Sequence, residues 1–177
     1  MNYILLLTLA FFFGVTNKVA DLLNEHGLKL FKHADILFGI IWGILGAFLM
    51  FFDQSIAINY FALIIYWFFM IKLDYKNHSL AGTIMLFAGI YIIDFTNFVI
   101  LQILLLFLLD FITILIQHKI ARSFPLLARL RLRIYLIPLL YSILMDNYLI
   151  FYVTVVAMIG VEIITISYDH YLKKNKK

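Results

Sequence analysis

The chain has 177 residues, of which 65% are hydrophobic and only 14% are charged. Soluble domains have roughly 45–50% apolar and about 25% charged residues, so this composition excludes a soluble domain and predicts an all-α, polytopic integral membrane bundle. The formal net charge of +4 does not indicate nucleic-acid binding, because no segment is polar enough to form a basic face on a soluble fold. Cysteine is absent, which excludes disulfides, thiolate metal sites and cysteine nucleophiles.

The apolar runs divide the chain into segments close to the length that a helix needs to cross the hydrocarbon, about 17 to 25 residues. We predict about seven transmembrane helices in a single domain, 1–177, and the spans are 2–23, 36–52, 55–71, 79–95, 97–116, 134–147 and 148–168. The sixth run is short and contains Pro138, so the sequence leaves open whether 125–147 is a full span. The first run has no Lys or Arg before it and no cleavage site after it, so we expect a spanning helix there.

The polar breaks between the runs are of two kinds. Breaks at Asp53, 94–97 and 146–147 contain no Lys or Arg, whereas all fourteen of these residues fall in the breaks at 17–34, 72–78, 117–133 and 169–177. The two kinds alternate along the chain, and the positive-inside rule then places the amino terminus outside and the carboxy terminus in the cytoplasm. The expected location is a cell membrane, the plasma membrane of a prokaryote, with the lipid bilayer as partner.

Small residues form a stripe in the second run, GIIWGILGA. Gly39, Gly43 and Gly46 with Ala47 let a neighbouring backbone come close, where lipid supplies no hydrophobic drive for association. We therefore expect this helix in the centre of the bundle.

Two polar segments, 27–35 and 124–133, are amphipathic enough to lie at the membrane interface. Around the second, Arg122, Arg129 and Arg133 fall near one face if the segment is helical. These arginines are candidates for contact with an anionic lipid, either as topology determinants or as a phosphate-binding group.

The stretch TNKVADLLNEHG, residues 16–27, breaks the apolar pattern directly after FFFGV. On a helix, Asn17, Asp21 and Glu25 recur at i, i+4 and i+8 and form a stripe of oxygen ligands. The later cluster KLDYKNHS repeats the order Lys, Asp, Asn, His, and in it Asp74 and His78 share one helical face. Because both clusters follow an outside-to-inside run, we predict a metal site at the cytoplasmic end, built from Asp21, Glu25, Asp74 and His78.

Carboxylates arranged in this way suit Mg²⁺, which binds through a few carboxylates together with substrate phosphate oxygens. A zinc site is disfavoured, since no His-x₃-His or Glu-x-x-His pair occurs within a segment. The pattern Asn17-Lys18-x₂-Asp21-x₃-Glu25 resembles the first aspartate motif of the UbiA family of intramembrane prenyltransferases, N-D-x-x-D-x-x-x-D, with Lys18 and Glu25 as departures. The resemblance implies that Asn17, Asp21 and Glu25 bind metal and an isoprenoid diphosphate.

Two further acids lie inside apolar runs, Asp110 in LLFLLDFITILI and Glu162 in AMIGVEIITIS. A charge that faces hydrocarbon costs at least about 2.5 kcal/mol on insertion scales, so both side chains should turn inward. We expect them to face one cavity and to share a proton, as a proton-coupled carrier needs. The alternative is that each is protonated and hydrogen-bonded to a neighbour such as Thr83, Thr113 or Thr165.

Three classes of function stay open on the sequence. The first is a metal-dependent enzyme that acts on a lipid or isoprenoid phosphate from the cytoplasmic side. The second is a small transporter whose intramembrane carboxylates couple transport to an ion. The third is a scaffold subunit of a membrane assembly, with no chemistry of its own.

Overall fold

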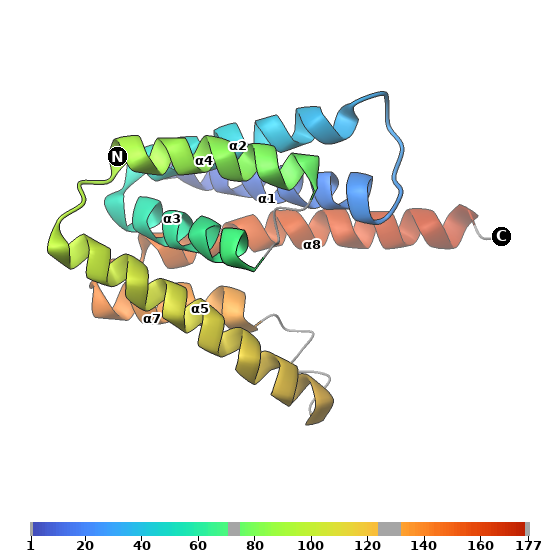
Figure 1. Cartoon of the computed structure of the whole chain (residues 1–177). Coiled ribbons are helices and arrows are strands. Elements are labelled where there is room, and N and C mark those ends of the chain that lie inside the picture. Colours follow the sequence, from blue (N-terminus) through green and yellow to red (C-terminus); the bar gives the residue numbers. More distant parts are fainter. Residues whose placement is uncertain (1, 71–74, 124–131, 176–177) are drawn as a thin grey trace.

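The computed structural model describes the backbone of residues 2–70, 75–123 and 132–175, and the side chains of these residues except 115–123, 132–133 and 175. The regular secondary structure of this part of the chain is all helical, which confirms the predicted all-α class (Figure 1). The helices are α1 (Tyr3–Glu25), α2 (Ala34–Phe52), α3 (Gln54–Phe69), α4 (Lys76–Ile92), α5 (Asn97–Ser123), α7 (Leu132–Leu144) and α8 (Leu149–Asn175).

Four of the helices are long and apolar enough to cross a membrane: α1, α2, the Asn97–Ile114 part of α5, and α8. The helices α3 and α7 are apolar but shorter, and α7 contains Pro138. At about 1.5 Å per residue, the 13 residues of α7 reach roughly 20 Å, against about 30 Å for the hydrocarbon core. The predicted helices are therefore present, and four of them meet the length of a membrane span.

Several helix ends differ from the predicted ones. The helix α1 ends at Glu25, two residues past the predicted end, whereas α5 continues past 116 to Ser123 and α8 continues past 168 to Asn175. The extensions of α5 and α8 are mainly polar, so polarity alone does not end these helices. Residues 26–33 form turns instead of an interfacial helix, because Gly27 and His33 adopt left-handed φ angles of 70° and 65°.

The small-residue stripe packs against α4. A Cβ placed on Gly39 would lie 2.6 Å from the Asn77 Cα atom, and one on Gly43 would lie 2.8 Å from the Ala81 Cα atom. The residue numbers rise together along both helices, so α2 and α4 run parallel at close backbone contact (Figure 1). The predicted close approach at this stripe is confirmed.

The expectation that α2 is the central helix is wrong, because α3 is the most enclosed one. The helix α3 contacts α2, α4, α5 and α8, and all residues from Ile56 to Ala62 are buried. The glycine stripe serves one neighbour and leaves another side of α2 open, where Ile44, Phe48 and Phe51 are exposed.

The helices α1 and α8 also run parallel. Gly14 of α1 lies against the Ala157 backbone, Gly160 of α8 lies against the backbone of Phe11, and near the far end the Tyr168 hydroxyl donates to the His26 carbonyl oxygen at 3.0 Å. Small residues again allow close backbone approach. This register places Asp21 of α1 level with about residue 164 of α8.

Polar contacts gather at the two ends of the bundle. At one end, the Asn147 amide donates to both carboxylate oxygens of Asp53 at 3.2 and 3.3 Å and to Ser55 Oγ at 3.1 Å. At the other end, His78 meets Asp21, and Tyr168 meets His26. The chain therefore brings polar residues from distant helix ends together on each side of an apolar middle.

Candidate metal centre at one end of the bundle

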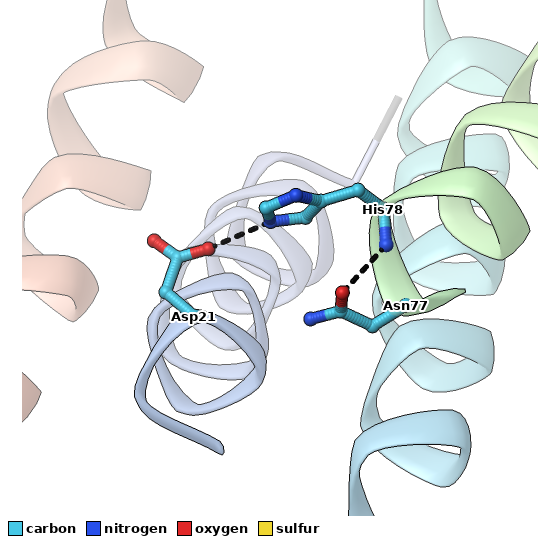
Figure 2. Close-up of polar contacts among 3 residues, drawn as sticks. All are labelled: Asp21, Asn77 and His78. Atoms are coloured by element: carbon cyan, nitrogen blue, oxygen red, sulfur yellow. Dashed lines mark hydrogen bonds and ion pairs between the residues drawn. The ribbon is translucent and has the colours of Figure 1, made fainter. Parts of the chain in front are cut away.

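Asp21 of α1 and His78 of α4 come together although they are 57 residues apart in sequence. Figure 2 shows the two side chains facing each other between the helices, with His78 Nε2 2.9 Å from Asp21 Oδ1. Their side chains are 14% and 26% exposed, so the contact is shielded but can still be reached. The predicted meeting of the two polar clusters is present for these residues.

Glu25 completes a group of three ligands. It lies one helical turn after Asp21 on α1, and the ligand atoms of Asp21, Glu25 and His78 are all within 4.8 Å of one another. Two ligands on opposite sides of a metal at about 2.1 Å are roughly 4.2 Å apart, so small side-chain rotations would bring all three onto one ion. The fourth predicted ligand, Asp74, lies outside the described residues.

The position of His78 follows from the packing of α4. Asn77 is fully buried against Gly39, and its Oδ1 accepts a hydrogen bond from the His78 backbone N–H at 2.8 Å. The imidazole then lies between aromatic rings, with centroid distances of 5.6 Å to Trp42 and 5.7 Å to Tyr75. A rigid backbone and ring contacts on two sides orient His78 toward α1.

Several polar atoms near this group have no hydrogen-bond partner among the described residues. Of the five buried side-chain atoms in that condition, four are Asn24 Nδ2, Trp42 Nε1, Asn77 Nδ2 and His78 Nδ1. A buried donor without a partner costs about 1–3 kcal/mol, and buried polar groups in folded proteins are normally satisfied. The concentration of such atoms around Asp21 and His78 indicates a place that accepts a ligand or ordered water.

The donor set determines which metals suit the group. Two carboxylates and one imidazole are ligands for Zn²⁺, Mn²⁺ and Fe²⁺, while Mg²⁺ prefers oxygen ligands alone. Zinc was disfavoured because no His-x₃-His or Glu-x-x-His pair occurs within one segment. Here the histidine comes from α4 and the acids come from α1, so that objection does not apply. Two carboxylates also balance the charge of one divalent cation.

A cavity of about 220 Å³ lies deeper in the bundle. Its wall is mainly apolar and includes polar residues from four helices: Asn17 of α1, Asn59 of α3, Asp110 of α5 and Thr154 of α8. Trp42 connects the two regions, because its ring contacts His78 and also Phe13 and Trp67 of the cavity wall. The candidate metal centre and the cavity are therefore neighbours.

The predicted intramembrane acids separate in the structure. Asp110 is buried, 6% exposed, and lies on the cavity wall. Glu162 is exposed on the outside of α8, while its neighbour Val161 lines the cavity. The expectation that both acids face one cavity and share a proton is wrong, because the rotation of α8 turns Glu162 outward.

The other predicted residues have different positions. Asn17 lies on the cavity wall, one turn deeper than Asp21, and is not part of the three-ligand group. The backbone of Arg122 is in α5 and that of Arg133 is in α7, whereas Arg129 and the side chains of all three lie outside what the structure describes.

Sequence reasoning missed Asn77 and Trp42 as residues of this site. Both were hidden in ordinary contexts, since Asn77 stood in a polar helix end and Trp42 in a stripe interpreted as packing. The signal that could have found Trp42 is its spacing of three residues from Gly39, which puts it on nearly the same side of α2.

Comparison with protein families, with curated proteins and with solved structures gives no match for this chain.

Proposed function

We propose that the protein is a membrane-embedded enzyme that uses a divalent metal to act on the phosphate group of a membrane lipid or isoprenoid. The observation that carries the proposal is the convergence of Asp21, Glu25 and His78 from two helices, with ligand atoms within 4.8 Å of one another. Asp21 and His78 are partly buried and Glu25 is exposed at the end of an apolar bundle, so a bound ion would lie close to the headgroups of the bilayer.

Asp21, Glu25 and His78 would hold the ion in this proposal. A divalent ion would supply charge stabilisation for phosphate oxygens. Asp21 and Glu25 would balance its charge, and His78 would position it relative to α4. The same arrangement serves hydrolysis of a phosphate ester or displacement of a phosphate leaving group, because both depend on stabilising charge on phosphate oxygens.

Membrane placement supports a lipid substrate over a soluble one. The Lys residues of the described chain gather at the end that holds Asp21 and His78, so we infer seven crossings with this end in the cytoplasm of a prokaryotic cell. The mainly apolar cavity next to Trp42 suits the first part of an acyl or prenyl chain.

Metal binding tests the proposal directly. Purified protein in nanodiscs should bind Mn²⁺ or Zn²⁺ with one site per chain, and Mg²⁺ more weakly, by isothermal titration calorimetry. Asp21→Asn and Glu25→Gln should each abolish binding, because a metal requires the charge of its ligand oxygens. Asp169→Asn is the matched control, since Asp169 is an exposed acid at the same end.

The second step measures substrate. A polyprenyl phosphate or diphosphate should bind only when the metal is present, and Asp21→Asn should remove this binding while the circular dichroism spectrum stays helical. Wild-type protein without affinity for any divalent metal, or with equal lipid affinity after chelation, would contradict an enzyme of this kind.

A transporter of divalent cations is the second candidate, and Asp110 favours it. This buried acid lies on the cavity wall with Asn17, Asn59 and Thr154, so oxygen ligands continue inward from the metal centre. Proteoliposomes loaded with a Mn²⁺ indicator distinguish the two functions. A transporter would move Mn²⁺ and lose this flux in Asp110→Asn, whereas the proposed enzyme shows no flux.

A further inference from the structure

Two neutral N–H donors beside the candidate metal centre have no hydrogen-bond acceptor among the described residues. Asn77 is fully buried, and its Oδ1 accepts from the His78 backbone, but its Nδ2 donates to no described residue. Trp42 is 1% exposed, and its Nε1–H likewise has no described acceptor. Buried donors are normally satisfied, so both are available to a ligand.

The packing of α2 on α4 brings both Trp42 and Asn77 next to His78. Gly39 has no side chain, which lets α2 lie directly on the Asn77 backbone, and Trp42 follows three residues later on α2. The Trp42 ring meets the His78 ring edge to face, with an interplanar angle of 76°. Figure 2 shows the Asn77 amide nitrogen directed toward α1, on the side where Asp21 meets His78.

We propose that Trp42 Nε1 and Asn77 Nδ2 form a neutral oxyanion-binding pair for a phosphoryl group held by the metal at Asp21, Glu25 and His78. This inference rests on the proposed function and adds the residues that recognise the ligand. A metal held by the three ligands would leave phosphate oxygens free to accept hydrogen bonds from the two N–H groups. Both side chains are held by the packing of α2 on α4 and against His78, and the ligand reaches their N–H groups by displacing the neighbours that now close them off.

The chemistry of the donors selects the ligand. An indole N–H can only donate, and the Asn77 oxygen already accepts from the His78 backbone, so the unpartnered groups of this pair are both donors. Two donors favour an acceptor-rich ligand over a cation. A phosphoryl group suits the pair because it has several acceptor oxygens and can bind the metal and two donors at once.

Conservative variants separate ligand recognition from folding. Trp42→Phe removes the N–H and keeps an aromatic ring against His78. Asn77→Asp keeps the oxygen that accepts from the His78 backbone and replaces the donor with a carboxylate oxygen. Trp67→Phe is the matched control for the pyrophosphate titration, since Trp67 packs against Trp42 on the cavity side and pyrophosphate has no chain to enter that cavity.

The experiment uses full-length protein in phosphatidylcholine nanodiscs and two readouts. Mn²⁺ binding is measured alone by electron paramagnetic resonance, and then inorganic pyrophosphate is titrated at saturating Mn²⁺. We expect pyrophosphate affinity to fall at least tenfold in Trp42→Phe and about a hundredfold in Asn77→Asp, where the new negative charge repels the ligand. Mn²⁺ affinity should stay within twofold of wild type in Trp42→Phe and be equal or higher in Asn77→Asp.

A second arm identifies the source of the phosphoryl group. Nanodiscs that contain phosphatidic acid replace the free pyrophosphate, and the shift of the thermal transition by Mn²⁺ is measured. A Trp42-dependent shift only with phosphatidic acid assigns the pair to a lipid headgroup, and pyrophosphate binding alone assigns it to a free phosphate. Either result supports the oxyanion pair.

Failure of the oxyanion pair and failure of the proposed function give different results. Normal Mn²⁺ binding without any phosphate binding in wild type, or equal phosphate binding in Trp42→Phe, Asn77→Asp and wild type, overturns the oxyanion pair and leaves the metal centre in place. Absence of Mn²⁺ binding in wild type overturns the proposed function, and the pair with it.

Discussion

A methyl group added at Gly39 should disturb the candidate metal centre, although Gly39 is not one of its ligands. The Cβ atom of Gly39→Ala would lie 2.6 Å from the Asn77 Cα atom, 2.8 Å from its carbonyl oxygen and 2.9 Å from its Cβ atom. Ordinary contact begins at 3.4 Å, so α4 has to move by about 0.8 Å at a point where backbone, not a flexible side chain, is in the way. His78 is the next residue, and a displacement of this size can lengthen its 2.9 Å contact with Asp21 beyond hydrogen-bonding range.

Two measurements follow from this displacement. Forcing a methyl group into a closed helix contact typically costs about 1–3 kcal/mol, which should appear in equilibrium unfolding by sodium dodecyl sulfate. Mn²⁺ affinity should fall by about 10- to 100-fold, the usual effect of misplacing a group that orients a metal ligand. Gly46→Ala is the matched control on the same stripe, because its new methyl group meets the flexible Met85 side chain. Unchanged Mn²⁺ affinity in Gly39→Ala would refute the claim that the α2–α4 contact positions His78.

Three further predictions concern the remaining polar residues. Asn147→Ala should lower the free energy of unfolding by about 1–3 kcal/mol, because it removes the donor to Asp53 and the cap on the Leu149 N–H, measured in the same detergent titration. Glu162→Leu should stabilise the bilayer-inserted protein by roughly 2–3 kcal/mol, and a loss of stability would indicate that a partner covers this acid. Single cysteines at Gln54 and Asn97 should react with an impermeant thiol reagent outside intact cells, whereas one at Lys76 should not; labelling of Lys76 from outside would reverse the inferred topology.

Part of the candidate metal centre was predictable because helix periodicity is local. Asp21 and Glu25 are four residues apart, so any helix through them gives one face with two carboxylates. The encounter with His78 needed one further inference, that two polar clusters at corresponding ends of outside-to-inside runs lie at one end of the bundle. The structure contains that encounter.

The orientation of α8 was not predictable for a physical reason. Its central segment is apolar on every side, so the sequence holds no stripe that distinguishes a face toward protein from a face toward lipid. Glu162 was assigned inward by its charge alone, but the small residues Ala157 and Gly160 fix the rotation through their contact with α1. In a membrane bundle, backbone approach at small residues determines rotation more strongly than a single polar side chain does.

Trp42 and Asn77 were missed because their environment also depends on the packing of helices that are distant in sequence. Whether a buried donor has a partner depends on what three different helices bring to it, and no spacing rule reports that. Trp42 and Asn77 become notable only after α2 and α4 are packed and their N–H groups are found without acceptors among the described residues. Helices and the spacing of two carboxylates can be predicted from local sequence. Buried donors without an acceptor can be identified only once the packing of the helices is known.

The charge of Lys18 should matter for phosphate binding at the candidate metal centre. Asp21, Glu25 and a divalent ion sum to zero, so a bound phosphate leaves negative charge that the neutral Trp42 and Asn77 cannot cancel. Lys18 lies one turn before Asp21 on α1, is 8% exposed, and forms no ion pair within the described chain. A phosphate at the metal would supply an anion for the ammonium group of this largely buried side chain. Lys18→Met should therefore weaken pyrophosphate binding at saturating Mn²⁺ by about tenfold or more, which corresponds to one charged contact. The same variant should leave Mn²⁺ affinity unchanged or raise it, because it removes a positive charge that repels the metal. If Lys18→Met weakened Mn²⁺ and pyrophosphate binding equally, Lys18 would be a structural residue of α1 and the phosphate would need another cation.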